Sequence, residues 1–133
     1  LLNNRNETPD IKENSVDIVF SFYSLEHLQE LDNSLSFCHK ILKPGGLLIG
    51  AIPNEGGILW GVGRVFTSQR SFSKMGFNYN KIISWEHPNF CDEIIKKIEN
   101  TYFKRIELRH HPLSFLKNYD LNLITSFVYK KKH

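Results

Sequence analysis

The sequence lacks the features of disulfide-rich, membrane-spanning and strongly basic proteins. Its 133 residues include only 2 cysteines, too few for a disulfide framework and typical of a reducing, cytoplasmic setting. No apolar run approaches the roughly 20 residues that cross a bilayer, and the pattern of the first residues leads us to expect no signal peptide. The net charge is +3, and the lysine run at 130–132 is typical of a solvated terminus. We therefore expect neither a membrane nor a nucleic acid as a partner.

Two motifs that would indicate a phosphate site or a zinc site are incomplete. Gly61-Val62-Gly63 lacks the third glycine of a phosphate-binding loop. His87 and Cys91 are four residues apart, but no second pair at zinc-ligand spacing accompanies them. His110-His111 is more typical of a strand end than of a ligand pair. The sequence therefore predicts neither of these sites.

A strand–helix–strand unit between Val16 and Pro53 organises the chain. Its two apolar runs, 16–24 and 47–53, show no strict alternation, which is typical of parallel strands that are covered on both faces. The unit has the length that a right-handed crossover between parallel strands requires. The sequence therefore predicts a parallel α/β arrangement.

The helix inside this unit can be located from its ends. Asp32 or Asn33 is the expected N-terminal cap, because their side chains accept backbone N–H bonds. Residues 43–46, Lys-Pro-Gly-Gly, are expected to end the helix in a turn. The side chains expected to face the sheet are Leu35, Cys38, Ile41 and Leu42.

The second half of the chain predicts another helix and a final pair of strands. Asn89 is a candidate cap, and acidic residues follow in the first turn. Residues 104–110 alternate like an edge strand, and 121–129 form a more hydrophobic strand that returns antiparallel to it. The expected buried stripe of the helix is Phe90, Ile94, Ile95, Ile98 and Tyr102.

Three segments carry a family resemblance: residues 14–19 (NSVDIV), 25–28 (LEHL) and 41–48 (ILKPGGLL). In this order they resemble the middle of a class I S-adenosylmethionine-dependent methyltransferase, from the fourth strand of that fold to the fifth. The resemblance implies an α/β, Rossmann-like sheet with parallel strands, an antiparallel last strand and helices on both faces. It also implies S-adenosylmethionine as the cofactor.

The glycine-rich loop after the first strand of that family, and the acidic residue that ends its second strand, are not found here. The chain therefore resembles the C-terminal half of the fold, and we interpret residues 1–133 as a single partial methyltransferase domain. In the strand order of the family, residues 16–22 would border the missing half and become an exposed edge. An exposed apolar edge predicts self-association.

The resemblance also implies cofactor-binding residues. Ligands of open α/β sheets bind beyond the carboxyl ends of the parallel strands. Ser21, Phe22, Tyr23 and Ser24 would therefore border the methionine part of the cofactor, with simple packing as the alternative for Phe22. Asn4 lies roughly where the family often holds an acidic residue against the adenine, and an amide can also pair with adenine. An exposed loop is the alternative there.

Two histidines are candidates for the general base, because imidazole titrates near neutral pH. These are His27, for which a structural role is the alternative, and His87. Some small-molecule O-methyltransferases hold a divalent cation with Glu-x-x-Glu-His at the place of His27. Here Tyr23 replaces the first carboxylate, so we expect no metal; Glu26 and His27 are the residues that a cation would use.

The connection over residues 54–88 is long for a compact domain. In the resembled family, insertions at this place cover the acceptor substrate, so we interpret it as a lid. Asn54, Trp60 and Arg64 are its expected substrate-binding residues. A loop that packs elsewhere, or a dimer contact, is the alternative.

The sequence as a whole therefore predicts transfer of a methyl group from S-adenosylmethionine to a small-molecule acceptor, at oxygen or nitrogen. Two other hypotheses stay open. One is a nicotinamide-dependent Rossmann oxidoreductase, against which the antiparallel last pair of strands argues. The other is a degenerate methyltransferase fold that serves as a binding or assembly subunit without catalysis.

Overall fold

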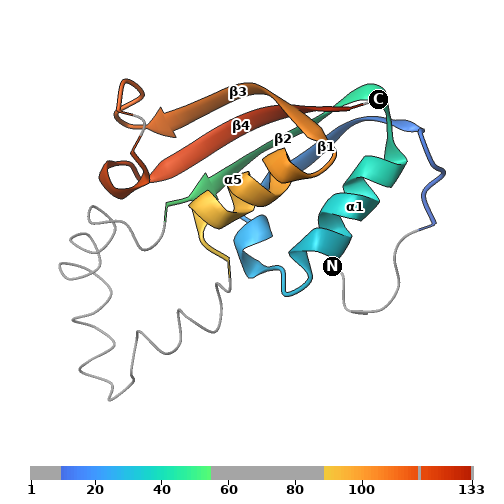
Figure 1. Cartoon of the computed structure of the whole chain (residues 1–133), viewed down its shortest axis with the longest axis horizontal. Coiled ribbons are helices and arrows are strands. Elements are labelled where there is room, and N and C mark those ends of the chain that lie inside the picture. The colour runs from blue at the N-terminus through green and yellow to red at the C-terminus, as the bar shows by residue number, and fades with distance from the viewer. Residues whose placement is uncertain (1–9, 55–88, 117, 133) are drawn as a thin grey trace, which may run out of the picture.

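A computed structural model describes residues 10–54, 89–116 and 118–132, in which helices α1 and α5 pack on one face of a four-stranded sheet (Figure 1). The strand order is β1-β2-β4-β3; β1 is parallel to β2, and β4 is antiparallel to both of its neighbours. This confirms the expected α/β sheet with an antiparallel last strand. The elements are β1 (Val16–Phe22), η1 (Leu25–His27), α1 (Leu31–Ile41), β2 (Leu42–Pro53), α5 (Cys91–Asn100), β3 (Phe103–His111), η2 (Tyr119–Leu121) and β4 (Ile124–Lys131).

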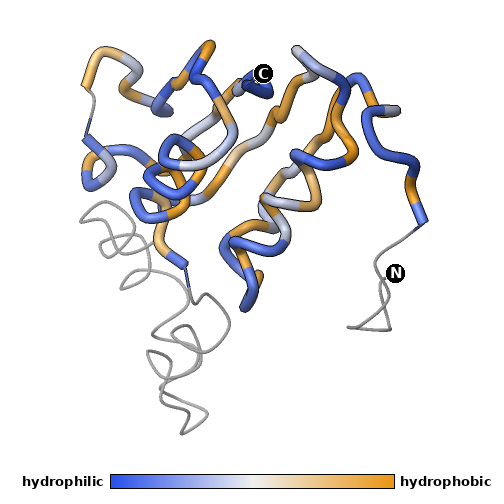
Figure 2. Tube along the Cα trace, turned by 45° about the vertical axis from the view of Figure 1, so that its right-hand side comes forward, coloured by the Kyte–Doolittle hydropathy of each residue, from blue (hydrophilic) through white to orange (hydrophobic). Residues whose placement is uncertain are grey.

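The strand–helix–strand unit lies where the sequence predicts it. β1 and β2 pair in parallel from Ile18–Leu47 to Phe22–Ala51, and α1 connects them. Hydrophobic and hydrophilic residues alternate around α1 (Figure 2), and its buried side chains include Leu35. The apolar side of α1 therefore packs on the sheet, as expected.

The start of α1 differs from the prediction. The residue before the helix is Glu30, and no side chain forms a capping hydrogen bond there. Asp32 and Asn33 instead lie inside the first turn, because the helix begins at Leu31. Asn33 Nδ2 donates to Glu30 Oε2 at 2.7 Å, so this side chain links the first turn to the residue before the helix and does not cap a backbone N–H.

The predicted turn over residues 43–46 is also wrong in form. β2 begins at Leu42, directly after the helix, and Val16 pairs with Leu42 before Ile18 pairs with Leu47. The four residues between therefore bulge out of the ladder. Gly45, at φ 78°, supplies the left-handed conformation that the bulge needs.

The core lies between the sheet and the two helices. Most of the predicted stripe of α5 is buried there, but Phe90 and Tyr102 are 51% and 46% exposed, which contradicts the prediction. Both residues lie outside the helix, where the helical spacing no longer holds, and the ring of Tyr102 stacks on His39 instead. The fully buried large side chains include Leu31, Leu35, Leu42, Leu48, Ile52, Ile94, Ile98, Phe103, Phe127 and Tyr129.

The final pair of strands is confirmed, with shifted ends. β3 is the edge strand, and β4 lies between β2 and β3. Residues 119–121 form the short 3-10 helix η2 rather than the start of the last strand. β4 pairs on both sides, and its alternate side chains are buried because they face the core, as the more hydrophobic pattern predicts.

No described helix covers the opposite face of the sheet (Figure 1). On the edge strand β1, Ile18, Phe20 and Phe22 are 40%, 63% and 54% exposed. The rings of Phe20 and Phe22 stack with centroids 6.1 Å apart. We define these three residues as the β1 apolar row. None of the described helices is long and apolar enough to cross a membrane.

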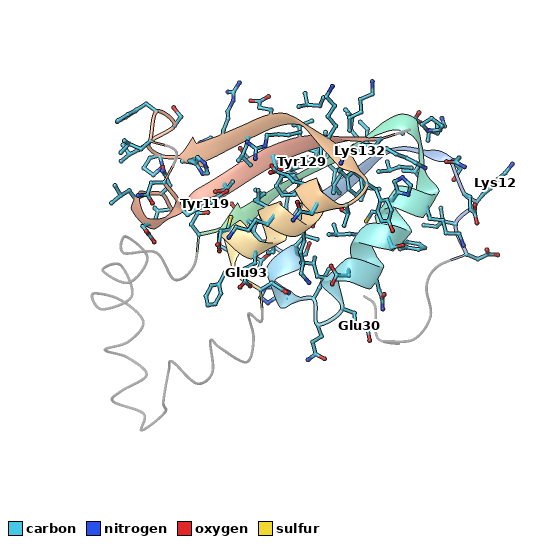
Figure 3. The ribbon with its side chains drawn as sticks, in the orientation of Figure 1. Lys12, Glu30, Glu93, Tyr119, Tyr129 and Lys132 are labelled. Carbon is cyan, nitrogen blue, oxygen red and sulfur yellow. The ribbon has the colours of Figure 1, made fainter. Side chains whose placement is uncertain are left out.

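A buried phenol ties β4 to the end of α5. Tyr129 is fully buried, and its hydroxyl donates to Glu99 Oε1 at 2.7 Å (Figure 3). The same oxygen accepts from Arg105 Nε at 2.5 Å. Burial and then the Glu99 carboxylate raise the pKa of Tyr129, so the phenol stays a donor throughout the physiological range. The hydrogen bond joins two elements of the core.

We expect Tyr129→Phe to lower the free energy of unfolding by about 1.5–3 kcal/mol, the contribution of a hydrogen bond to a charged group. Urea denaturation measures this change. The control is Tyr102→Phe, a half-exposed ring, which should change the value by less than about 0.5 kcal/mol. Equal effects of the two substitutions would contradict a specific role for the Tyr129 hydroxyl.

We propose that the 133-residue chain, made alone, self-associates through β1. An apolar edge strand with unpaired N–H and C=O groups invites pairing with another chain. Phe20→Lys should therefore shift the chain toward a monomer in light scattering. Phe115→Lys is the matched control, because Phe115 is 77% exposed but lies outside the sheet. A monodisperse monomer of the unmodified chain would exclude this proposal.

Candidate active site

Six buried polar residues gather at one end of the sheet. The parallel strands β1 and β2 end there, the antiparallel strand β3 ends there, and β4 begins there, because Pro53 and His111 both pair with Ile124. Burying a polar side chain is costly unless its groups are satisfied. The carboxyl end of the parallel strands is therefore the candidate site. The six buried polar residues near this end are Ser21, Glu26, Asn54, His110, Asn122 and Thr125.

The four residues predicted to border the cofactor lie at this end. Ser21 is buried, and its Oγ lies 2.7 Å from Ser24 Oγ. The side chains of Phe22 and Tyr23 are about half exposed, and Phe22 packs on Phe20 rather than in the core. The last residues of β1 and the loop that follows therefore offer two hydroxyl groups and two accessible aromatic rings.

The backbone of Tyr23 has an unusual conformation. Its φ is 50°, in the left-handed region that a non-glycine residue rarely adopts. Its N–H donates to Ala51 O at 2.9 Å, which continues the parallel ladder by one bond beyond β1. Strained residues of this kind cluster at functional sites. The conformation turns the chain from β1 into the loop that carries Ser24 and η1.

The short helix η1 brings Glu26 and His27 to the same end. Glu26 is 2% exposed, whereas the His27 side chain is 47% exposed. Glu26 Oε1 lies 3.9 Å from His27 Nε2. Among the described residues, no group of three or more His, Cys, Asp or Glu side chains could hold a metal ion.

Asn89 holds this loop in place from far along the chain. Its Nδ2 donates to Leu28 O at 2.6 Å and to Leu25 O at 3.4 Å. The predicted role of Asn89 as the cap of α5 is therefore wrong: Phe90 precedes the helix, without a side-chain cap. Since the carbonyl groups at the end of η1 need donors, the amide satisfies them and fixes η1 against the start of α5.

Three buried side chains form a chain of hydrogen bonds across β2, β4 and β3. Thr125 Oγ1 donates to Asn54 Oδ1 at 2.7 Å. His110 Nδ1 lies 2.9 Å from Thr125 Oγ1. The ring of Tyr119 packs edge-on against His110 with centroids 4.9 Å apart. Asn54, predicted as a substrate-binding residue, is thus linked to two residues that sequence reasoning missed.

Burial keeps two titratable side chains at this end of the sheet, Cys91 and His110, in their neutral forms. Burial raises the pKa of Cys91 to about 12; a hydrogen bond with Thr125 lowers it, and the charges of Asp92 and Glu26 raise it further. The thiol is therefore protonated and is not a nucleophile. Burial, then the charges of His111 and Arg105, lower the pKa of His110, so its imidazole is neutral at pH 7.

The structure thus brings most of the described candidates together. Ser21, Ser24 and Glu26 lie at the end of β1, and Asn54 follows the neighbouring strand. His110-His111 ends β3, as predicted. The other predicted residues, Asn4, Trp60, Arg64 and His87, lie outside the described residues, and so does the predicted lid over residues 54–88 except for Asn54.

The strain at Tyr23 can be measured. We expect Tyr23→Gly to be more stable than Tyr23→Ala by about 1 kcal/mol, because only glycine adopts a positive φ without steric cost. The two free energies of unfolding, compared in urea, isolate the backbone effect, since both variants lose the same ring. As a control, the same pair of substitutions at Tyr102, outside this region of φ, should favour alanine. A more stable alanine at position 23 would contradict the strain.

The comparisons with known proteins agree with this geometry. Residues 2–50 match a family model described as a methyltransferase domain. No curated protein matches the chain.

Solved structures resemble nearly the whole chain at low identity. A S-adenosylmethionine-dependent methyltransferase from Thermotoga maritima, titled a possible histamine N-methyltransferase, is 20% identical, with a TM-score of 0.59 over 95% of this chain and 60% of its own. A methyltransferase from Archaeoglobus fulgidus has 12% identity and a TM-score of 0.59 over 91% and 62%. The [4+2]-cyclase SpnF has 12% identity and a TM-score of 0.57 over 95% and 53%.

The chain thus spans between half and two thirds of the length of these structures. At such identities the likeness establishes the fold, while the family model covers the segment that carries the sequence motifs. The described residues have the class I S-adenosylmethionine-dependent methyltransferase fold, and the family resemblance indicated by the sequence is confirmed.

Proposed function

We propose that the protein is a S-adenosylmethionine-dependent methyltransferase that acts on a small-molecule acceptor, at oxygen or nitrogen. The observation that carries the proposal is β4, which lies antiparallel between β2 and β3 beside the parallel pair β1–β2. An antiparallel last strand argues against a nicotinamide-dependent Rossmann oxidoreductase. The matched family model supports the same reading.

The residues at the carboxyl end of β1 suit this cofactor. A sulfonium is a cation, and cations are stabilised by aromatic rings and by carboxylates. Phe22 and Tyr23 offer accessible rings there, and Glu26 offers a carboxylate on the next element. Ser21 and Ser24 offer hydroxyl groups for the polar part of its methionine portion. The residues present therefore fit the cofactor.

The bound cofactor would supply a methyl group that is already activated for displacement. The tasks left to this chain are to align the acceptor and to remove its proton, and alignment alone can lower a barrier by roughly 7–11 kcal/mol. His27 is the described imidazole that suits proton removal, because its side chain is about half exposed beside Glu26. The loop that carries His27 is held by Asn89, which gives this base a fixed position.

A second function is a methyltransferase fold that binds a ligand without methylating it. The observation that favours it is the likeness to the [4+2]-cyclase SpnF, whose name describes another reaction on a similar fold. Both functions would use the carboxyl end of β1 and β2. They differ in whether His27 takes part in chemistry.

We further propose a cytoplasmic setting. Cys38 and Cys91 are both free thiols, and buried free thiols are stable in a reducing compartment. Fractionation of cells that express the complete gene product would locate it directly.

Calorimetry with S-adenosylmethionine tests the proposed function in the complete gene product that contains this chain. Tyr23→Ala should weaken binding at least about tenfold, because it removes a ring of the proposed site. The matched control is Phe115→Ala, which removes an exposed ring outside the sheet and should leave binding unchanged. The 133-residue chain alone should bind negligibly, since the glycine-rich loop of the family is missing from it. Micromolar binding by a monomeric chain would show that the alignment to the C-terminal half is wrong.

Activity separates the two functions. His27→Asn should lower kcat by about 10²-fold or more and leave the cofactor affinity unchanged, because a general base acts in the reaction and not in binding. Methyl transfer from radiolabelled S-adenosylmethionine to a panel of small phenols and amines would measure this. Cofactor binding without transfer to any acceptor, in a protein with intact His27, would favour the binding function.

A further inference from the structure

Asn54 carries a buried donor that no described residue uses. The residue follows β2 directly and is 2% exposed. Its backbone N–H donates to Leu123 O at 2.8 Å, and its Oδ1 accepts from Thr125. Its Nδ2 is buried and has no hydrogen-bond acceptor in the described part of the chain. A buried donor without an acceptor is costly, and native structures contain few.

The other two amides at this end behave differently. Asn122 is fully buried, and its Nδ2 donates to Leu116 O and to Asn118 O, while its Oδ1 accepts from Leu113 N. Asn89 uses its Nδ2 on the carbonyl groups of η1. Both amides therefore have a complete structural role. Asn54 alone among these three keeps its donor unused.

The Asn54 amide turns its oxygen toward Thr125. Because an amide oxygen can only accept, the Thr125 hydroxyl donates to Asn54 Oδ1. Thr125 Oγ1 then accepts from His110 Nδ1, which must carry a proton. With Oδ1 held in this way, Nδ2 is the atom left for a ligand, and hydrogen bonds in such a chain strengthen one another.

Burial of this group selects the ligand. The charges near the hydrogen-bond chain have both signs: Glu26 and Asp92 act on Cys91, whereas His111 and Arg105 act on His110. The Asn54 amide itself is buried and carries no charge. Binding an anionic oxygen there would cost more desolvation than binding a neutral carbonyl or amide oxygen, which could accept the hydrogen bond.

We propose that Asn54 Nδ2 binds a neutral carbonyl oxygen of the methyl acceptor, and that Thr125 and His110 are positioning residues that hold the amide in this orientation. The proposal rests on the proposed function, because it places the acceptor at the carboxyl end of β2. It names the acceptor class as a neutral molecule with a carbonyl or amide oxygen.

The test uses benzamide and benzoate as probes, since they have nearly the same shape and differ in charge. The side-chain NH₂ signals of Asn54 are followed by NMR in the complete gene product and are identified by their loss in Asn54→Asp. Benzamide should shift these signals in a saturable way, and benzoate should bind at least about tenfold more weakly. Thr125→Val should weaken benzamide binding about tenfold, whereas Thr125→Ser, which keeps the hydroxyl, should restore it.

Two controls separate binding from folding. Asn122→Asp should lower the melting temperature and leave the benzamide affinity unchanged, because Asn122 serves only the loop. Calorimetry with S-adenosylmethionine on the Thr125 variants should give the affinity of the unmodified protein, so that failure of the proposed function would be seen separately. The proposal is overturned if neither probe shifts the Asn54 signals, if benzoate binds as well as benzamide, or if Thr125→Val binds benzamide normally.

Discussion

The close approach of β1 and β2 at Gly50 is the constraint on which the site depends. A Cβ atom added at Gly50 would lie 2.1 Å from Ser21 O and 2.6 Å from Phe127 Cζ. Only glycine therefore lets the parallel strand and the ring from β4 meet at this point. Its consequence reaches the site, because Gly50 pairs with Ser21, three residues before Ser24. A wider spacing here would move the end of β1 away from Asn54 at the end of β2.

The sequence could predict the helices and strands that depend on residues close to one another in the chain. The apolar runs of β1 and β2 and the helical spacing of Leu35 and Ile41 are read from neighbouring residues, and all of them lie where they were expected. The sequence predicts that Val16–Phe22 is a strand covered on both faces. Within the described residues only one face is covered, and the β1 apolar row lies exposed on the other face. The apolar pattern of β1 thus predicts burial of both faces, whereas the described helices bury only one.

The sequence could not predict features that depend on distant residues. The bulge over residues 43–46 follows from the register of β2 against β1, which no local pattern contains. The sequence predicts Asn89 as a helix cap because it lies just before α5. Its amide instead donates to carbonyl groups at η1, more than 60 residues before it in the chain. Thr125 and His110 gave no signal of their own, because each acquires its role only when β2, β4 and β3 lie side by side.

The two ends of the sheet also differ in the kind of polar interaction that they hold. At the end where β1 begins, the exposed pair Lys43–Asp17 joins β2 to β1, and the exposed pair Lys40–Glu13 joins α1 to the segment before β1. Such exposed pairs contribute little to stability and cost little to make. At the opposite end the polar side chains are buried, which is costly unless each group has a partner. Asn122 meets this requirement within the chain, so its burial serves folding. The Asn54 Nδ2 donor does not meet it among the described residues, so its position at the carboxyl ends of the parallel strands is better explained by a ligand than by folding.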